Sequence, residues 1–364
     1  MTKKRFICMA LVLIMCVALA ACTTPTPAAP GGTAPGGTAP ADDAPATPDR
    51  TFNIMLAMTP GGMPRTDSPD IQWAYTFKEQ VEANSGGAIT VEIFPSGQLG
   101  TAAETIQGVI AGNIEMTIVD VALVSNVFPY AQLFTAPGVF ASVEEFDAFA
   151  LSPRGMQFRE DLRATTGIQM LDMVCKGFRN FTTSNRELRV PEDARGVTFR
   201  TQESPIMIRM VEALGARAVP MPGSEMYVAM QQGVVDGQEN PVLNIIQDLT
   251  YEVQTYLVLN GHVAGSMVFL INGRLYDEMG PELQAVVNEA SAVAVAAAQE
   301  VIERRNREGV QILRDYGMTV YEPTVEELAM WREAVYGPTQ EFLRETLGGD
   351  VVEEFSAALN TFRG

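Results

Sequence analysis

The stretch from Lys176 to Pro241 constrains the fold most, because apolar strand patterns and helix signals alternate along it. Residues 167–176 predict an apolar strand, and the polar sequence Gly177-Phe178-Arg179 follows it. Residues 197–200 repeat this arrangement and end at Arg200. Alternating strands and helices predict a largely parallel sheet in an α/β fold, and ligands of such sheets gather beyond the carboxyl ends of the strands. We therefore expect Arg179 and Arg200 near strand ends, facing a cleft.

Helix signals fill the rest of this stretch. Ser204-Pro205 opens a helix that Gly215 ends, and Ser224-Glu225 opens another that Gly233 stops. The polar residues 238–240, Gln-Glu-Asn, are interpreted as a turn ahead of Pro241. From this position the Asn240 side chain can either cap the next helix or point into the cleft.

Charge narrows the possible ligands and partners. The chain has 25 basic and 44 acidic residues, a net charge of −19, which excludes nucleic acid as a partner. A surface this acidic repels anions, so an anionic ligand needs a local basic pocket. Arg179 and Arg200 can supply one. The alternative for Arg200 is a surface ion pair with Glu192, Glu203 or another carboxylate.

The amino terminus predicts export. Three basic residues, Lys3 to Arg5, precede an apolar run of about sixteen residues, which is typical of a signal peptide. Leu19-Ala20-Ala21-Cys22 is similar to a bacterial lipobox, in which the cysteine carries the lipid. Residues 1–21 are thus the predicted signal peptide, and residues 22–50, rich in Pro, Thr, Gly and Ala, a flexible tether. Processing removes three positive charges and leaves 22 minus 44, or −22.

The remaining chain, about 310 residues, exceeds what one core organises, so two lobes are expected. From Pro281 a helical pattern of about 35 residues is long enough to span both lobes or to break once near Glu308-Gly309. A strand at residues 115–120 ends in Asp120. Further strands are predicted at residues 52–58, 89–94, 256–260 and 267–272, and helices at 71–83, 102–111, 326–336 and 351–362.

No catalytic, metal or cofactor signature emerges. His262 is the single histidine, which removes a multi-histidine metal site, and no P-loop or dinucleotide fingerprint is present. Cys175 lies in an apolar strand and is interpreted as an inert core thiol. We expect His262 to be structural and predict neither a cofactor nor a bound metal.

Several ordered motifs carry a family resemblance. The chain resembles the DctP-like solute-binding proteins of tripartite ATP-independent periplasmic (TRAP) transporters. The matching blocks are F-P-x-G-Q-L-G at 94–100, G-x-R at 177–179, T-T-S-N-R at 182–186, P-E-D-x-x-G-x-x-x-R at 191–200, A-L-G-A at 213–216, P-M-x-x-S-E-x-Y at 220–227 and V-D-G-Q-E-N-P at 235–241.

The resemblance implies a two-lobed, type II periplasmic-binding-protein-like fold with a hinge and a long C-terminal helix spanning the lobes. It implies one lobe from residues 51–176 plus about 266–306, and a second from 177–265 plus about 307–364 that carries the arginines.

It also implies that Arg200 binds a ligand carboxylate through two hydrogen bonds and that Arg179 and Asn240 contact the ligand as well. The resemblance implies too that Asp120 contacts the ligand from the first lobe. The alternative is that Asp120 is a solvated carboxylate at the end of its strand. Relatives commonly carry an aromatic residue before the serine of the P-M-x-x-S-E block, where this chain has Gly223. Gly223 is therefore expected to leave space beside the ligand.

The expected function is an exported, lipid-anchored receptor on the outer face of the cytoplasmic membrane. It captures a small organic acid and delivers it to a small DctQ-like and a large DctM-like membrane subunit. It is not expected to be an enzyme. Two alternatives are an enzyme for an anionic substrate, with Asp120 or Glu239 as general base, and the sensory input of a signalling system.

Overall fold

The computed structural model describes residues 50–59 and 64–364. The predicted signal peptide, nearly all of the tether and the lipid attachment residue Cys22 lie outside the described residues.

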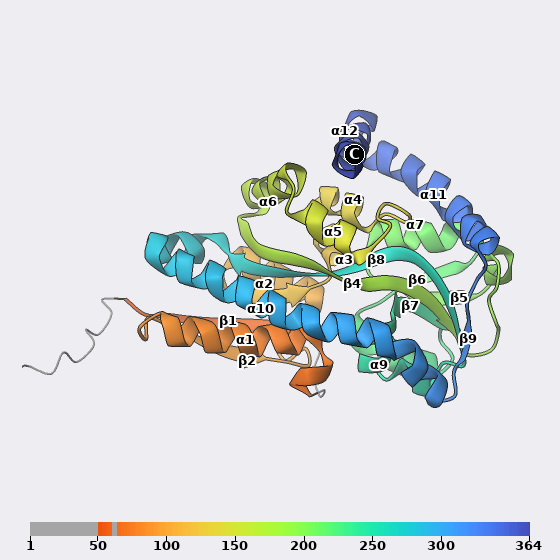
Figure 1. Cartoon of the computed structure of the whole chain (residues 1–364), viewed down its shortest axis with the longest axis horizontal. Coiled ribbons are helices and arrows are strands. Elements are labelled where there is room, and N and C mark those ends of the chain that lie inside the picture. Colours follow the sequence, from red (N-terminus) through yellow and green to blue (C-terminus); the bar gives the residue numbers. More distant parts are fainter. Residues whose placement is uncertain (1–49, 60–63) are drawn as a thin grey trace, which may run out of the picture. The chain divides into compact units, whose positions relative to one another are not determined.

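Two groups of parallel strands lie at opposite ends of one mixed sheet (Figure 1). In the first group β1 pairs with both β2 and β3, and in the second β5 pairs with both β6 and β7. The long antiparallel strands β4 and β8 connect the groups, and β9 pairs with β8. The bounds are β1 Phe52–Met58, β2 Ile89–Phe94, β3 Met116–Val119, β4 Ile168–Thr183, β5 Thr198–Thr201, β6 Arg217–Pro220, β7 Gly237–Pro241, β8 Tyr256–Asn272 and β9 Thr319–Tyr321.

Several strand predictions are confirmed and others are wrong. β1 and β2 have the predicted bounds, but the two strands expected at residues 256–272 are one strand, β8. The strand expected to end at Lys176 continues to Thr183, so Arg179 lies inside β4 rather than near its end. The β4–β8 register shifts at three places, between Met170 and Asp172, Cys175 and Gly177, and Arg179 and Phe181, and such irregularities bend a strand and increase its twist.

The segment interpreted as a polar turn is also a strand. All five residues of β7, Gly-Gln-Glu-Asn-Pro, are buried between β4 and β5. Polar side chains in a buried strand give no apolar pattern, so sequence periodicity cannot detect it.

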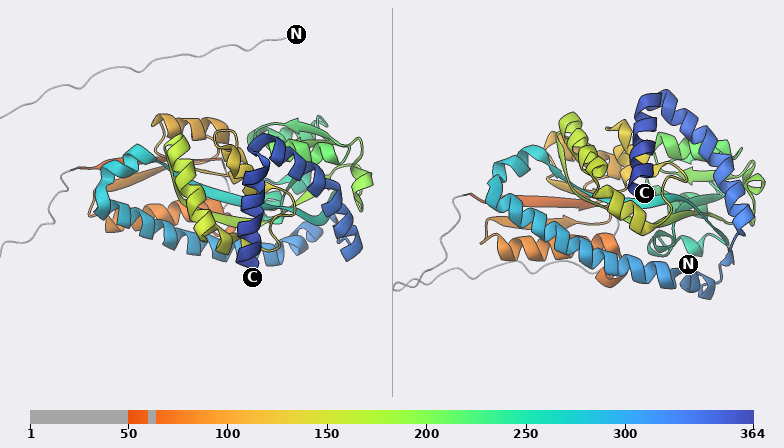
Figure 2. Two further views of the ribbon diagram at one scale, coloured as in Figure 1. Left: turned by 90° about the horizontal axis from the view of Figure 1, so that it is seen from above. Right: turned by 45° about the horizontal axis from the view of Figure 1, so that its top comes forward.

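Helices α1, Pro69–Asn84, and α10, Gly273–Asp315, pack side by side over one face of the sheet (Figures 1 and 2). The kink in α10 lies at Gly280, whose φ is 72°, directly before Pro281. Of the two alternatives given for this helical pattern, the break near Glu308-Gly309 is wrong, because Gly309 lies inside the helix. A Cβ there would lie 2.6 Å from Val242 Cγ1, so glycine permits close packing against the next layer.

By length and composition α10 also meets the criteria for a membrane-spanning helix among the described residues. Its buried residues, including Val287, Ala294 and Ile302, pack with α1 and the first group of strands. We therefore interpret α10 as a core helix.

Helices that include α11 and α12 cover the opposite face, whereas α9 packs against α10. Trp331 of α11 stacks on Phe181 of β4, and Phe355 of α12 packs against Phe134 and Phe149. The bounds are α2 Ala102–Ala111, α3 Val121–Val124, α4 Gln132–Thr135, α5 Val143–Ala150, α6 Pro153–Thr166, α7 Pro205–Ala213, α8 Gly223–Gln231, α9 Val242–Gln247, α11 Val325–Leu347 and α12 Gly349–Arg363, with 3-10 turns at Arg65–Asp67, Pro129–Ala131, Pro191–Ala194 and Thr250–Glu252.

Candidate ligand-binding site

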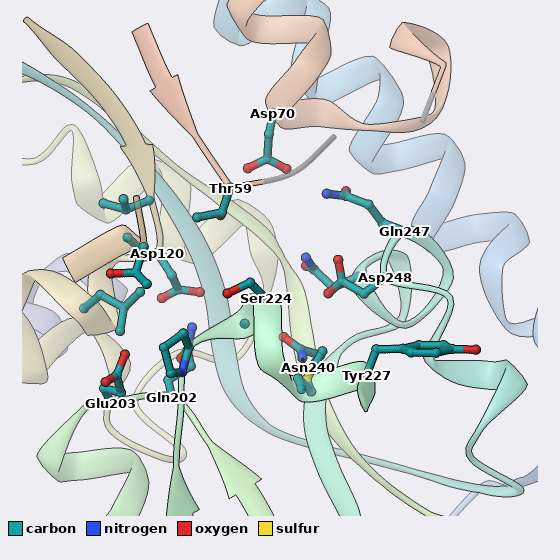
Figure 3. Close-up of a pocket in the computed structure, with 18 of the residues that line it drawn as sticks. Thr59, Asp70, Asp120, Gln202, Glu203, Ser224, Tyr227, Asn240, Gln247 and Asp248 are labelled. Carbon is teal, nitrogen blue, oxygen red and sulfur yellow. Dashed lines mark hydrogen bonds between the residues drawn. The ribbon is translucent and has the colours of Figure 1, made fainter. Parts of the chain in front are cut away.

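A cavity of about 400 Å³ lies where the carboxyl ends of both strand groups meet. Its lining includes residues at or just beyond the ends of β1, β2 and β3 on one side, and of β5, β6 and β7 on the other (Figure 3). This is the location that a sheet of alternating strands and helices predicts for a ligand. These six residues are Thr59, Ser96, Asp120, Gln202, Pro222 and Asn240.

Arg200 lines the cavity and is buried, with 5% of its surface exposed. Its Nε and Nη2 atoms donate to the carbonyl oxygen of Met221, at 3.1 and 2.8 Å. The outer edge formed by Nη1 and Nη2 therefore stays open to a second acceptor. Within residues 50–59 and 64–364 no carboxylate pairs with this guanidinium. The predicted alternative of a surface ion pair with Glu192 or Glu203 is wrong.

Burial and a neighbouring cation both act on the charge of Arg200. Burial, followed by repulsion from Arg179, lowers the pKa of Arg200 to about 10. The group is still cationic at neutral pH, and its charge is poorly compensated by the protein. A buried charge is costly unless it is paired, so this cavity favours an anionic ligand.

Gly223 is the first residue of α8 and lies beside Arg200. A Cβ at this position would sit 3.8 Å from Arg200 Nη2, an ordinary van der Waals distance. Its φ is not positive, so the backbone does not require glycine here. The missing side chain instead adds volume to the cavity.

Asn240 and Asp120 reach the cavity from opposite lobes (Figure 3). The Asn240 side chain donates to Gln238 Oε1 at 2.6 Å and makes no capping bond to α9, so of its two predicted orientations the cleft is the correct one. Asp120 accepts from Ala122 N at 2.9 Å and caps α3. Its carboxylate is only 10% exposed, so the alternative of a solvated carboxylate is wrong.

Arg179 does not line the cavity. Its Nε and Nη2 donate to the two carboxylate oxygens of Glu239, at 2.5 and 2.8 Å, and its Nη1 lies 3.4 Å from Asp120 Oδ2. His262 Nε2 lies 3.3 Å from the same Glu239 carboxylate. These side chains form a buried network directly behind the cavity wall, and its one cavity-facing member is Asp120.

The network keeps Glu239 ionised. Burial by itself raises the pKa of the Glu239 carboxyl, but Arg179 and His262 outweigh that effect and bring the pKa to about 2. His262 stacks on Phe181, and burial lowers its pKa. The expectation that His262 is structural fits this place in the network.

A second polar group in the cavity was not predicted from the sequence. Lys176 Nζ lies 3.6 Å from Asp70 Oδ1, and Asp248 lines the same region. Burial raises the pKa of Asp248 to about 6, against the attraction of Lys176 and Arg200. Lys176 was detectable, because it is the one cation in an otherwise apolar strand pattern. Asn244 and Gln247 also line the cavity, and their spacing of three residues places both on one face of α9.

Two further sequence expectations concern reactive groups. Cys175 is fully buried, and burial raises the pKa of its thiol to about 12, as expected for an inert core cysteine. In the described part of the chain, no cluster of histidine, cysteine or carboxylate side chains has the composition of a metal site.

This arrangement defines a class: a two-lobed binding protein with a polar cavity between the lobes, lined by a buried arginine. The family described as "Bacterial extracellular solute-binding protein, family 7" (DctP) matches residues 61–346, and the chain belongs to this family. It is therefore an extracytoplasmic solute-binding protein, as the motif resemblance implied.

Relatives and solved structures agree with this assignment. The chain is 28% identical over 294 residues, 80% of its length, to the C4-dicarboxylate-binding periplasmic protein DctP of Rhodobacter capsulatus, of which 87% is covered. It matches the sugar acid binding protein DctPAm of Advenella mimigardefordensis, solved with galactonate, with a TM-score of 0.80 and 29% identity, covering 86% of this chain and 99% of that one.

A TRAP periplasmic solute-binding protein of Polaromonas, bound to D-erythronate, matches with a TM-score of 0.78 and 26% identity, covering 84% and 98% of the two chains. The two-lobed fold with its long C-terminal helix, α10, is thus confirmed.

Proposed function

We propose that this chain is the receptor of a TRAP transporter and that it binds a small organic acid through Arg200. The observation that carries the proposal is a buried guanidinium, with its outer edge open to the cavity and no carboxylate partner among the described residues. The names of the relatives support it, since a C4-dicarboxylate-binding protein and proteins solved with galactonate or D-erythronate are among them. A small DctQ-like and a large DctM-like membrane subunit then receive the ligand.

In this proposal the site residues have different roles. Arg200 donates two parallel hydrogen bonds to the ligand carboxylate. Asn240 donates or accepts a hydrogen bond beside it, and Gly223 leaves space for the ligand. Asp120 approaches from the first lobe as the lobes close. Arg179, which was expected to touch the ligand, acts through Asp120 and Glu239 instead, because its guanidinium is occupied by those carboxylates.

We propose that the chain is not an enzyme. Glu239 is a poor general base because its pKa is about 2 and it does not line the cavity. Asp120 is held by the α3 backbone and by Arg179. A receptor for a signalling system would use the same site. The neighbouring genes distinguish transport from sensing: two adjacent membrane-protein genes indicate transport, and a kinase gene indicates sensing.

The test of the proposed function is a thermal-shift screen of organic acids against the purified protein. A ligand at a hundred times its Kd stabilises the folded state by about 2.7 kcal/mol. Stabilisation by one or more carboxylic acids, and by none of their neutral amides, supports the proposal. A screen in which amides and acids act alike contradicts it.

Replacing Gly223 by phenylalanine is expected to lower the affinity for an acid large enough to fill the cavity by about tenfold or more, because the ring occupies ligand space. Calorimetry measures the affinity. Gly223→Ala is the matched control, since its Cβ makes only an ordinary contact with Arg200. An unchanged Kd in the phenylalanine variant would place the ligand away from α8.

The lipobox predicts that Cys22 anchors the protein to the membrane. Cys22→Ala is expected to move the protein from the membrane fraction to the aqueous fraction and to leave ligand affinity unchanged, because the tether separates the anchor from the folded lobes. Mass spectrometry of the native N-terminus provides the direct check. An unmodified first residue elsewhere in the chain would rule the anchor out.

A further inference from the structure

One region of the cavity contains buried polar atoms that have no partner within the part of the chain that the structure describes. They are Asp70 Oδ2, Asn244 Oδ1 and both side-chain amide atoms of Gln247. We call Asp70, Asn244, Gln247 and the neighbouring Asp248 the α1–α9 subsite, after the helices that carry or adjoin them. Asp70 and Gln247 are 3% and 6% exposed, and Figure 3 shows their polar ends directed toward the same space.

Unpartnered buried polar groups are rare because each has lost its hydrogen bonds to water and gained none in the protein. Where several of them line one cavity, a ligand that supplies their partners restores such hydrogen bonds. The α1–α9 subsite is therefore built to form hydrogen bonds with the ligand and not only to enclose it.

The balance of donors and acceptors indicates which ligand groups fit. Three of the four unpartnered atoms are oxygens, and the fourth is the amide nitrogen of Gln247. A carboxylate only accepts hydrogen bonds, so it can satisfy the nitrogen but none of the oxygens. A hydroxyl group donates and accepts, and can therefore satisfy both kinds of atom.

Charge points the same way. Asp70 and Asp248 surround one cation, Lys176, so the group carries 1 − 2 = −1 when both carboxyls are ionised. A second ligand carboxylate would face this excess negative charge. A ligand ammonium is attracted by it, but an ammonium only donates hydrogen bonds and so leaves the Gln247 nitrogen unpartnered. A neutral hydroxyl group meets no such repulsion and can satisfy both the oxygens and the nitrogen.

We propose that the ligand is a hydroxylated monocarboxylic acid, with its carboxylate on Arg200 and its hydroxyl groups on the α1–α9 subsite. This inference rests on the function proposed above. It excludes unsubstituted dicarboxylic acids and amino acids as the preferred ligands.

Calorimetry on the full chain in mild detergent tests the proposal with acids matched in length. The six-carbon set is gluconate, adipate, hexanoate and 6-aminohexanoate, and the four-carbon set is D-erythronate, succinate, butyrate and 4-aminobutyrate. In at least one set the hydroxylated acid is expected to bind about tenfold or more tightly than the others. Tighter binding of a dicarboxylate, a plain acid or an amino acid overturns the inference and leaves the organic-acid receptor standing. Failure of all eight acids to bind overturns both.

Two variants test the residues. Gln247→Leu is expected to weaken binding of the hydroxylated acid about tenfold or more, and to leave the weak binding of the plain acid unchanged. The ligand-free melting temperature is expected not to fall, because a hydrocarbon replaces an unpartnered amide. Asn244→Leu is the second variant if the first does not fold.

Gln340→Leu is the matched control. Gln340 is equally buried, at 6% exposed, but lies on α11 and does not line the ligand cavity. Gln340→Leu is expected to leave the affinities for the hydroxylated acid and for the plain acid unchanged. If Gln247→Leu and Asn244→Leu weaken the plain and the hydroxylated acid by the same factor, or weaken neither, the α1–α9 subsite does not recognise hydroxyl groups.

Discussion

Replacing Arg200 by methionine is expected to weaken ligand binding by about 2–5 kcal/mol, the range for removing one partner of a buried charge pair. The loss is large because, in the described lining, Lys176 is the only other cation, and Asp70 already pairs with it. The unliganded protein is expected to stay folded. Removing a desolvated charge offsets the loss of two hydrogen bonds to the Met221 carbonyl.

Arg200→Lys separates charge from geometry. The lysine retains a positive charge but cannot present two parallel N–H groups, so a loss of about 1.5–3 kcal/mol is expected, smaller than that of the methionine variant. Arg217→Met is the control, because Arg217 is exposed on β6 and does not line the cavity. Calorimetry that finds wild-type affinity in Arg200→Lys would contradict the paired contact with a carboxylate.

Replacing Glu239 by alanine is expected to lower the free energy of unfolding by about 3–5 kcal/mol at neutral pH. The substitution leaves the Arg179 guanidinium, which is 2% exposed, with Asp120 as its one remaining carboxylate partner. It also removes the acceptor from His262 Nε2. Urea unfolding followed by circular dichroism measures the change.

Glu79→Ala is the matched control for this experiment. Glu79 also pairs with an arginine, Arg65, but its side chain is 56% exposed, and exposed ion pairs contribute about 0–1 kcal/mol. If the two substitutions cost the same, the buried network does not stabilise the fold in the way its geometry indicates.

Glu239→Ala is also expected to change how the free energy of unfolding depends on pH in acid. The pKa of Glu239 is about 2 in the folded protein, against an ordinary value of 4.5, so the unfolded chain binds more protons between these values. The stability from Glu239 is therefore complete above about pH 4.5 and is lost as the pH falls toward 2. Glu239→Ala is expected to remove this slope, and subtracting the two curves cancels the titration of groups that do not interact with Glu239. A difference between the curves that does not change over this range contradicts the prediction.

Local signals predicted much of the fold. β1, β2 and α2 have the predicted bounds because alternation, turn glycines and a Thr-Ala-Ala-Glu capping sequence each act within a few residues. The order of motifs indicated the family, and one departure from the family pattern, Gly223, marks a residue that does line the cavity.

The roles of the two arginines could not be separated at this level. Arg179 and Arg200 both follow apolar strand patterns, and the sequence predicts the same environment for each. Across the β4–β7 pairing Arg179 contacts Glu239, whereas among the described residues Arg200 donates only to a backbone carbonyl. Partners 60 and 21 residues apart along the chain, in different strands and loops, decide which guanidinium remains available to a ligand.

By itself, the sequence determined the alternation of strands and helices and the position of Arg200 at a strand end, because these depend on local patterns of hydrophobicity, turn residues and charge. The export signal lies outside the described residues and stays a prediction. Only the tertiary structure decided that β7 is a buried polar strand, that β4 and β8 connect two lobes, and that Asp70 and Gln247 face one cavity. Their positions depend on strand pairing and packing between segments that are far apart along the chain, such as Asn180 and Asn240 in the β4–β7 pairing, and no local pattern specifies such pairs.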